Sequence, residues 1–187
     1  MIAKKLIKTT NRMEENHKAI AIPVTEVNGE LKFLIVHDKR FREWTFVTGG
    51  CRHREIINPI RTALRELEEE TRGVVSLKRG TYNYFKFNAT FEPLEKAIYH
   101  VYIFPVTMDT LDMKTSIDKF DKEKWKMDTN QVCFRKNYDE NDFMKFSNLE
   151  EIKTCSSTWK FILDNIIENK DFYDALYDKN FSHFNIV

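Results

Sequence analysis

The sequence predicts an α/β (α+β) protein, with helices on both faces of a mixed central sheet. Three observations predict this class: strand-length apolar runs open the chain, an amphipathic helix follows them, and further strands lead to a second amphipathic helix near the end. Because 187 residues suffice for one buried core, and because the sequence contains no internal repeat or linker, we expect a single domain over residues 1–187.

The first three strands are predicted at Ala19–Val24, Leu31–His37 and Trp44–Thr48. Asn28-Gly29 joins the first two strands as a hairpin, since both residues tolerate positive φ. Gly49-Gly50 is then expected to end the strand pattern, and the polar loop Cys51–Ile57 follows.

A helix is predicted to begin at Asn58-Pro59. Asn can cap the first free amides, and Pro at the first helical position gives up a hydrogen bond that the helix would not make. The helix is expected to run to about Arg72, because Gly73 follows and Gly commonly lies just beyond a helix C-terminus.

The remaining strands are predicted at Tyr82–Thr90, Ile98–Val106 and Phe143–Phe146, and a closing helix at Ser156–Phe172. The first two of these strands form a hairpin around Glu92-Pro93. One face of the closing helix gathers apolar side chains at helical spacing: Trp159, Ile162, Leu163, Ile166 and Ile167. Residues 109–142 are charged and poorly periodic, contain a short predicted helix at Ile117–Lys126, and are interpreted as an insertion over the functional site.

The composition argues against two features, a strong overall charge and a zinc site. Thirty Lys plus Arg against 29 Asp plus Glu leave no overall field to draw the chain to nucleic acid or a membrane, so any basic surface must be local. The three cysteines, Cys51, Cys133 and Cys155, lack the close pairing of a zinc site and are expected to be reduced thiols.

Residues 1–18 are interpreted as an N-terminal extension, since they contain no apolar run of the kind that a signal peptide needs. No stretch of the chain approaches the ~20 apolar residues of a membrane span. We therefore expect a cytoplasmic protein with no membrane partner, and no stable protein partner is predictable from the sequence.

The segment from Gly49 to Val74 carries the information about chemistry. At about 100° per residue, Glu66, Glu69 and Glu70 fall within about a 100° arc of the predicted helix, beside an apolar stripe. Like charges at this spacing repel one another, and a divalent cation would reverse that repulsion. Clustered carboxylate oxygens suit Mg²⁺ or Mn²⁺, which retain several waters and also contact substrate phosphates.

A plainer interpretation is an acidic, solvated helix face with Arg–Glu pairs, such as Arg65 with Glu69. The residues before the helix argue against it. A double glycine follows a strand, and a short loop leads into the capped helix, so the glycine backbone can approach a metal ion and phosphates.

The run Arg65-Glu66-Leu67-Glu68-Glu69-Glu70 resembles the core of the Nudix hydrolase signature, with Gly73-Val74 as its closing glycine and apolar residue. The stretch from Trp44 to Gly50 is similar to the aromatic strand and double glycine of that family. The resemblance implies a Nudix-type α/β/α sandwich and a hydrolase that cleaves phosphoanhydride bonds.

Two departures from the signature concern its spacing. The stretch from Gly50 to Arg65 is one residue longer than the family pattern, which displaces the loop glutamate and leaves Glu55 as the candidate partner of Arg65. Arg72 adds one residue before Gly73. Neither departure touches the glutamates of the core.

The resemblance also implies roles for individual residues. Glu66 and Glu70 are expected to ligate the metal, and Glu69 to ligate it or to accept a proton from the attacking water. The carbonyl of Gly50 is the further metal ligand expected, and Arg65 is grouped with the catalytic residues. The structural residues of the signature are expected at Gly49, Glu55 and Gly73. The implied cofactor is Mg²⁺ or Mn²⁺.

Candidates for substrate binding are Arg52, Arg54 and Trp44. The two arginines, with His53, lie in the loop beside the predicted metal site and suit phosphates, although a solvated polar loop explains them equally well. Trp44 is expected either to stack on a base or to pack in the core. A second carboxylate often comes from a downstream loop in this family, and the candidates are Glu92, Glu95, Glu123, Glu140 and Asp142.

Three functions stay open. The first is a pyrophosphohydrolase of a nucleotide or of capped RNA, in keeping with a loose similarity to Nudix decapping enzymes of large DNA viruses, which would place the chain in the host cytoplasm. The second is a diphosphoinositol polyphosphate hydrolase, whose cation cluster would come from Arg52, Arg54, Lys78, Arg79 and Lys86. The third is an inactive nucleotide- or RNA-binding module, and the intact set of glutamates argues against it.

Overall fold

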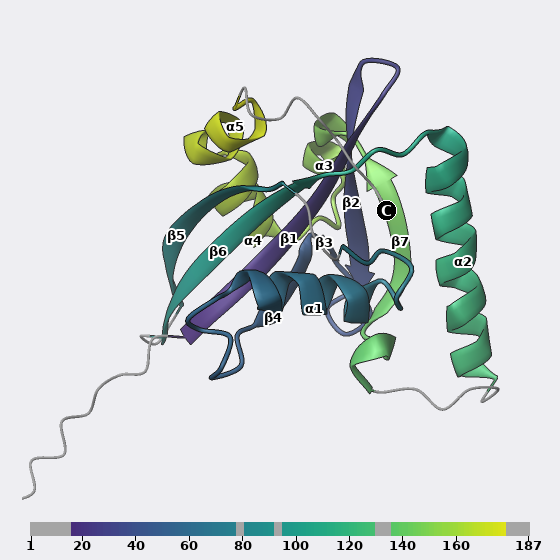
Figure 1. The fold of residues 1–187 in the computed structure, drawn as a ribbon, viewed down its shortest axis with the longest axis horizontal. Coiled ribbons are helices and arrows are strands. Elements are labelled where there is room, and N and C mark those ends of the chain that lie inside the picture. Colours follow the sequence, from purple (N-terminus) through teal and green to yellow (C-terminus); the bar gives the residue numbers. More distant parts are fainter. Residues whose placement is uncertain (1–15, 78–80, 92–94, 130–135, 179–187) are drawn as a thin grey trace, which may run out of the picture.

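In the computed structural model, which describes residues 16–77, 81–91, 95–129 and 136–178, the chain forms one mixed sheet flanked by helices (Figure 1). The strands of the described part are β1 (Asn16–Val27), β2 (Glu30–Asp38), β3 (Trp44–Thr45), β4 (Val47–Gly50), β5 (Asn83–Phe91), β6 (Glu95–Pro105) and β7 (Asn141–Ser147). Its helices are α1 (Ile60–Glu70), α2 (Thr110–Asp128), the 3-10 turn η1 (Lys136–Asp139), α3 (Leu149–Thr154), α4 (Lys160–Ile162), the π-helix η2 (Leu163–Ile167) and α5 (Lys170–Leu176).

Strand β1 lies at the centre of the sheet, whose order is β3-β2-β1-β6-β5, with β4 paired to β1 and β7 paired to β2. β1 runs parallel to β6, with Ile20 opposite Val101, and antiparallel to β2 and β4. Asn28 and Gly29 have positive φ, as the predicted hairpin requires. β5 and β6 also form an antiparallel hairpin, whose predicted turn at Glu92-Pro93 lies outside the described residues.

Successive side chains of β1 point to opposite faces of the sheet and so enter two different cores. Ile20 and Ile22 pack with residues of α3, α4, η2 and α5. Ala19 and Ala21 pack with residues of α1 and with Phe120 of α2. The helices therefore form a layer on each face, which confirms the predicted α/β/α arrangement.

The strand predicted at Trp44–Thr48 is two strands in the structure. β3 pairs with β2, and after Phe46 the chain crosses over to pair with β1 as β4. Gly49 and Gly50 are the last residues of β4, so the prediction that they end the strand before them is wrong. They extend the ladder because pairing uses backbone N–H and C=O groups, which glycine retains.

Helix α1 differs from the prediction at both ends. Pro59 takes the N-cap position and no side chain caps the first turn, so the capping role predicted for Asn58 is wrong. At the other end, Arg72 N–H donates to Glu69 O and Gly73 N–H to Glu68 O, which is a Schellman motif. Arg72 and Gly73 have φ of +56° and +74°. The additional residue of the signature therefore takes a left-handed conformation that more often holds glycine.

The closing helix predicted at Ser156–Phe172 is three short segments, α4, η2 and α5. Asn169 interrupts it, because its side chain accepts a hydrogen bond from Asp171 N–H and caps α5. Its apolar face is buried nevertheless, with Ile162, Ile166 and Ile167 at most 2% exposed. The prediction also missed α3, which begins at a capping box between Asn148 and Glu151.

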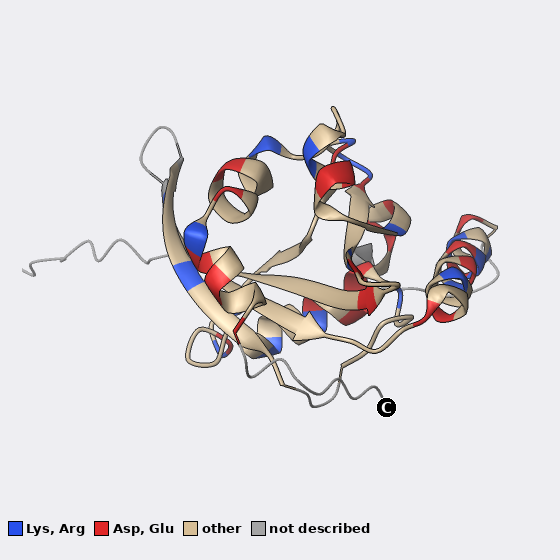
Figure 2. Cartoon of the chain, turned by 90° about the horizontal axis from the view of Figure 1, so that it is seen from above, with Lys and Arg blue, Asp and Glu red and all other residues tan. Residues whose placement is uncertain are grey.

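Helix α2 has 19 residues and is longer than the helix predicted at Ile117–Lys126. It begins at a capping box formed by Asp109 and Asp112. Figure 2 shows α2 at one side of the molecule, with both signs of charge along it. Its described side chains do not line the cavity presented below. No helix within the described ranges is both long and apolar enough to cross a lipid bilayer.

Candidate active site

Three carboxylates lie on the buried side of α1. Glu66, Glu69 and Glu70 are 9%, 5% and 7% exposed, and we call these three residues the acidic patch. Ala63 and Leu67, on the adjacent stripe of the helix, are fully buried against the sheet. The apolar stripe therefore fixes α1 on the sheet, and the acidic patch follows at the border between α1 and β4.

Gly49 is required by the close approach of Glu66. A Cβ atom at Gly49 would lie 2.0 Å from Cδ of Glu66, far inside van der Waals contact. A Cβ atom at the neighbouring Gly50 would meet nothing within 4 Å. Gly49 thus leaves room for a carboxylate, whereas the role predicted for Gly50 concerns its backbone carbonyl.

Arg65 is the cation of the acidic patch, and all five N–H groups of its guanidinium have a partner. Nη1 donates to Glu66 Oε1 at 2.6 Å and to Glu69 Oε2 at 3.0 Å. Nε and Nη2 donate to the two carboxylate oxygens of Glu55, both at 3.0 Å. Nη2 also donates to the carbonyl of Gly50 at 3.1 Å. One side chain thereby connects the loop, β4 and α1.

Glu55 therefore pairs with Arg65 although the loop is one residue longer than the family pattern. Its Oε2 atom also accepts hydrogen bonds from Arg52 N–H and from the Thr62 hydroxyl, both at 2.9 Å. The hydrogen bond from Arg65, opposed by burial and supported by the other two donors, lowers the pKa of Glu55 to about 2. Glu55 is a fixed anion at neutral pH.

Glu70 points away from Arg65, toward β4 and β7. The backbone N–H of Thr48 donates to Oε1 of Glu70 at 3.2 Å, and Nδ2 of Asn141 donates to Oε2 at 3.2 Å. Burial, and next the charge of Glu66, raise the pKa of Glu70 well above its ordinary value. A neighbouring cation would relieve this cost.

Arg72 links the end of α1 to α2 and β7. Its side chain is fully buried, with the guanidinium carbon 3.9 Å from the centre of the Phe120 ring. Nη2 donates to the carbonyl of Asn141, while Nε and Nη1 have no hydrogen-bond partner. Asp139 Oδ1 lies 4.0 Å from Nη2 and also lacks a hydrogen-bond partner. Burial lowers the pKa of Arg72, because the charged form is poorly solvated.

The acidic patch has the donor atoms for a divalent cation but is not closed around one. Among the described residues, no three His, Cys, Asp or Glu side chains are arranged to hold a metal ion. Arg65 Nη1 lies between two of the carboxylates, and the third is bonded to Thr48 and Asn141. Burial also raises the pKa of Glu66, so the two raised pKa values mark carboxylates that a cation would stabilise. The donor atoms suit a divalent cation, but the three carboxylates would have to rotate before they could converge on one.

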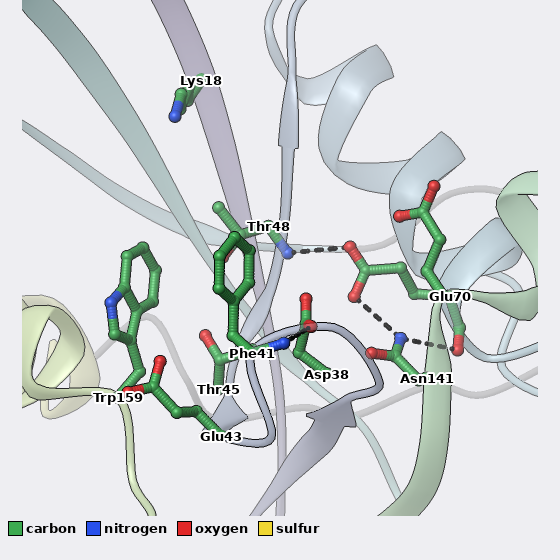
Figure 3. Close-up of a pocket in the computed structure, with 10 residues that line it drawn as sticks. Lys18, Asp38, Phe41, Glu43, Thr45, Thr48, Glu70, Asn141 and Trp159 are labelled. Carbon is green, nitrogen blue, oxygen red and sulfur yellow. Dashed lines mark hydrogen bonds between the residues drawn. The ribbon is translucent and has the colours of Figure 1, made fainter.

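A cavity of about 300 Å³ adjoins the acidic patch at Glu70 (Figure 3). Its lining residues are Lys18, Asp38, Phe41, Glu43, Thr45, Thr48, Glu70, Glu140, Asn141 and Trp159. Figure 3 shows Glu70 on one side of the cavity and the rings of Phe41 and Trp159 away from it. A tight turn holds Phe41, since Asp38 Oδ1 accepts hydrogen bonds from the N–H groups of Arg40 and Phe41, both at 2.7 Å.

Comparison with protein families identifies the family of this chain. The family model of the NUDIX domain matches residues 15–145. The chain belongs to the Nudix family. Membership of this family makes the chain a hydrolase of phosphoanhydride bonds, as the sequence predicts.

Solved structures share the Nudix fold. The NUDIX domain of Shewanella oneidensis NrtR with ADP ribose is similar with a TM-score of 0.52 and 12% identity, over 80% of this chain and 82% of that chain. NrtR of the same organism with a 27mer DNA has a TM-score of 0.51 and 12% identity, over 78% and 57%. A binary complex of the C. elegans Ap4A hydrolase has a TM-score of 0.48 and 13% identity, over 78% and 89%. A search of curated proteins found no match.

The predicted substrate-binding residues of this Nudix site differ in their surroundings. Arg52 Nη2 lies 3.4 Å from Glu69 Oε1, and its side chain is 60% exposed. Arg54 is exposed in the same loop. Trp44 does not line the cavity: Lys145 Nζ lies 4.2 Å from the centre of its ring, and His37 packs edge-on against it. The structure therefore brings the loop Cys51–Ile57, which we call the arginine loop, to the acidic patch. It leaves Trp44 beside β2 and β7.

Of the three downstream carboxylates whose side chains the structure describes, Glu140 is the one that lines the cavity. It shares this cavity with Glu70, and its charge contributes to the raised pKa values of Glu66 and Glu70. Glu123 instead pairs with Lys126, and Asp142 lies 3.9 Å from Lys124. Glu92 and the side chain of Glu95 lie outside the described residues, as do Lys78 and Arg79.

Several of the residues that line the cavity are not predicted from the sequence. Phe41 and Glu43 sit in a loop between two strands, and Asn141 begins β7, so no local pattern links them to α1. Lys18 was assigned to the N-terminal extension, yet it belongs to β1 and lies opposite Gly50. The alternation of β1, continued backward from Ile20, places Lys18 on the same face as that residue and was the signal that would have included it.

Proposed function

We propose that this Nudix protein is a Mg²⁺- or Mn²⁺-dependent pyrophosphohydrolase of a nucleoside diphosphate derivative, and that its substrate is the 5′ cap of mRNA. The observation that carries the proposal is the cavity that begins at Glu70 and reaches Phe41 and Trp159. A diphosphate held at the acidic patch would direct the attached nucleoside into this cavity.

The acidic patch is assigned to the cation, with the carbonyl of Gly50 as a further ligand. The bound ion supplies neutralisation of the pyrophosphate oxygens and activation of water. The two bonds of Nε and Nη2 to Glu55 hold the planar guanidinium of Arg65 in place. Uptake therefore requires the carboxylates of Glu66 and Glu69 to turn away from Nη1 of Arg65. Glu55 and Arg65 thus act as a fixed support for a movable set of ligands.

The reaction needs a base as well as a cation. Water attacks one phosphorus atom, the bond from that phosphorus to the leaving phosphate oxygen breaks, and a carboxylate takes the proton of the water. We assign the proton to Glu69 and keep Glu140 as the second candidate, because it lines the cavity beside Glu70. Arg52, 3.4 Å from Glu69, is placed to contact a phosphate oxygen.

The lining of the cavity favours a nucleobase. Phe41 and Trp159 offer ring faces for stacking, and Asp38 and Glu43 offer carboxylate oxygens as acceptors for base N–H groups. A guanine methylated at N7 carries a positive charge, which both aromatic rings and carboxylates attract. This chemistry suits the methylated guanine of an mRNA cap.

The same lining disfavours an inositol pyrophosphate. Such a ligand carries many phosphates and needs a dense cluster of cations. Among the lining residues, Lys18 is the one cation beside four carboxylates, those of Asp38, Glu43, Glu70 and Glu140. The exposed Lys86 belongs to β5 and does not line the cavity.

The test is an assay of released products with Mg²⁺ or Mn²⁺ on capped RNA, nucleoside diphosphate derivatives and an inositol pyrophosphate. We expect 7-methyl-GDP from capped RNA, and we expect Glu69→Gln to abolish its release. Orthophosphate from the inositol pyrophosphate alone would replace the proposal by the second function. Equal inactivity of the wild type and Glu69→Gln on every substrate would identify an inactive binding module.

A pair of tryptophan variants tests base recognition. Trp159→Ala removes a ring from the cavity, whereas Trp125→Ala removes a 57% exposed ring from α2, which does not line it. We expect Trp159→Ala to raise KM for capped RNA about tenfold or more, since stacking on one aromatic side chain contributes about 1–3 kcal/mol. Trp125→Ala should leave KM unchanged. An equal effect of both variants would remove the assignment of this cavity to the base.

A further inference from the structure

On one face of the outer hairpin, formed by β5 and β6, the side chains of β5 are open to solvent, whereas His100 and Tyr102 of β6 are buried. Tyr82, in the residues leading into β5, and Tyr84 are each 43% exposed, while Phe85 on the opposite face is 8% exposed. Figure 1 shows β5 at the edge of the sheet, with α1 beside the inner strands. We call the residues of this side the tyrosine face: Tyr82, Tyr84, Lys86, Asn88 and Thr90, with Lys96, Ile98 and His100 of β6.

The rings of the tyrosine face are held in fixed positions. Tyr84 and His100 stack at 6.1 Å and 19°, and His100 stacks on His17 of β1 at 5.3 Å and 15°. Tyr84 Oη is 2.9 Å from His100 Nδ1, and His17 Nδ1 is 3.0 Å from His100 Nε2. Tyr82 packs edge-on against Tyr102 at 5.3 Å. Since these rings are already ordered, a ligand that stacks on them loses little additional side-chain entropy.

The charge of the tyrosine face suits an anion. Lys86 and Lys96 are both exposed, and Lys86 lies across the ladder from His100. Among the described side chains of the face there is no carboxylate. Exposed aromatic rings interspersed with cations on a sheet are the combination with which proteins bind single-stranded nucleic acid.

The tyrosine face is continuous with the acidic patch. The backbone carbonyl of His17 accepts a hydrogen bond from Cys51 N–H at 2.8 Å, which fixes the start of the arginine loop against β1. The next residue of that loop, Arg52, reaches Glu69, and Arg54 is exposed. A polynucleotide leaving the acidic patch would therefore meet two arginines before it meets the ring stack of His17, His100 and Tyr84.

We propose that the tyrosine face binds the single-stranded RNA that follows the cap, with bases stacked on Tyr82 and Tyr84 and with phosphates on Lys86, Arg52 and Arg54. The inference rests on the proposed function for the identity of the ligand. It goes beyond that function because it assigns a second binding surface, on the outer hairpin, away from the cavity that takes the base of the cap.

The direct test is the binding of an uncapped, fluorescently labelled single-stranded RNA, measured by anisotropy at several salt concentrations. We expect the double variant Tyr82→Ala/Tyr84→Ala to raise Kd about tenfold or more, since each stacked base contributes appreciably. The matched control is Tyr177→Ala, which removes a tyrosine that is 66% exposed just after α5. We expect this control to bind as the wild type does. The variant Lys86→Gln should reduce the salt dependence by about one phosphate contact.

One further variant and two measurements of folding control for an effect on the fold. Tyr82→Phe/Tyr84→Phe keeps the rings and removes the hydroxyl groups, so it should restore binding to within about twofold of the wild type if stacking is responsible. Far-UV circular dichroism and thermal unfolding of all variants report whether the sheet is intact. Wild-type affinity of the folded double alanine variant, or equal losses in it and in Tyr177→Ala, would overturn the inference.

A kinetic comparison separates this inference from the proposed function. Hydrolysis of a cap dinucleotide needs no RNA body, whereas hydrolysis of a capped 30-mer does. We expect the double alanine variant to raise KM for the 30-mer about tenfold and to leave both kcat and the dinucleotide reaction unchanged. If the wild type cleaves both substrates and the variant matches it on both, the tyrosine face is wrong and the proposed function stands. If the wild type cleaves neither, yet RNA binding depends on the two tyrosines, the proposed function fails and the face stands.

Discussion

Two arginines near the acidic patch lie in opposite surroundings. Arg65 donates five hydrogen bonds, and every one of its carboxylate partners is within 3.0 Å. Arg72 is more deeply buried, yet two of its three guanidinium nitrogens have no hydrogen-bond partner, and the nearest carboxylate atom, on Asp139, lies 4.0 Å away. The region around Arg65, which we call the matched region, pairs its cation with carboxylates. The region around Arg72, which we call the unmatched region, leaves its cation incompletely paired.

Arg65 and Arg72 differ in how much they contribute to the stability of the site. A buried charge stabilises a fold when its partners satisfy it, and it costs free energy when they do not. Arg65 therefore contributes to stability. Arg72 connects α1 to Phe120 and Asn141, and its contacts have to offset the burial of an incompletely paired cation.

The largest expected effect is that of Arg65→Met, which removes the cation of the matched region. The variant leaves Glu55, Glu66 and Glu69 without their shared cation, so we expect the free energy of unfolding in metal-free buffer to fall by about 3 kcal/mol. Urea denaturation measures it. Arg61→Met, on the exposed side of the same helix, is the control and should change stability by less than about 0.5 kcal/mol. Similar losses in the two variants would contradict the role of the Arg65 network.

A second change keeps every charge and moves one of them. Gly49→Ala would place a Cβ atom 2.0 Å from Glu66 Cδ and displace that carboxylate. We expect kcat/KM to fall about 100-fold while the fold is retained, because a displacement of about 1 Å at a reacting centre has an effect of this size. Gly50→Ala, where the Cβ atom meets open space, should stay within about threefold of the wild type. Full activity of Gly49→Ala would contradict the prediction that a Cβ atom at residue 49 displaces the carboxylate of Glu66.

Acid titration compares the matched region with and without its cation. The folded pKa of Glu55, about 2, lies below its ordinary value of 4.5, so this carboxylate contributes stability above pH 4.5 and loses the contribution as pH falls toward 2. In Arg65→Met the pKa of Glu55 returns toward its ordinary value. The stability difference between wild type and variant should therefore shrink from pH 5 to pH 3 in urea titrations. A difference that is constant over this range would assign the loss to packing.

The smallest effect is expected in the unmatched region. Arg72→Met keeps the volume and the left-handed backbone while it removes an incompletely paired cation, so we expect the free energy of unfolding to change by less than about 1 kcal/mol. The same urea assay gives this value beside that of Arg65→Met. If the two losses are equally large, the bond to Asn141 and the contact with Phe120 outweigh the cost of burial, and the contrast between the two arginines disappears.

Most of the sheet could be predicted because its signals are local. The apolar alternation of β1 and β2 and the turn Asn28-Gly29 determine that hairpin without any distant residue. The crossing at Phe46 could not be predicted, because pairing first with β2 and then with β1 leaves no trace in the composition of the segment. The break in the closing helix depends on Asn169, whose side chain caps α5 and competes with the helix backbone. The apolar periodicity of the segment continues across this break, so the sequence pattern does not reveal it.

The same distinction applies to the site. The acidic patch and the Glu55–Arg65 pair belong to one segment of the sequence, so spacing and the family resemblance were enough to propose them. The partners of Glu70 come from elsewhere: Thr48 lies on β4, and Asn141 is the first residue of β7. The lining residues Phe41 and Trp159 are also far apart in sequence. Contacts of this kind arise from the tertiary fold and carry no periodic signal.

The position of β1 also bears on folding kinetics. β1 pairs with three strands, and its partner β6 joins it through contacts such as residue 20 with residue 101. Such long-range parallel pairing has a high contact order and is reached slowly, after the local hairpins. Because Lys18 and the Gly49-Gly50 pair lie on this same strand and its neighbour, refolding chains should regain ligand binding in the slowest phase, together with the completion of the sheet.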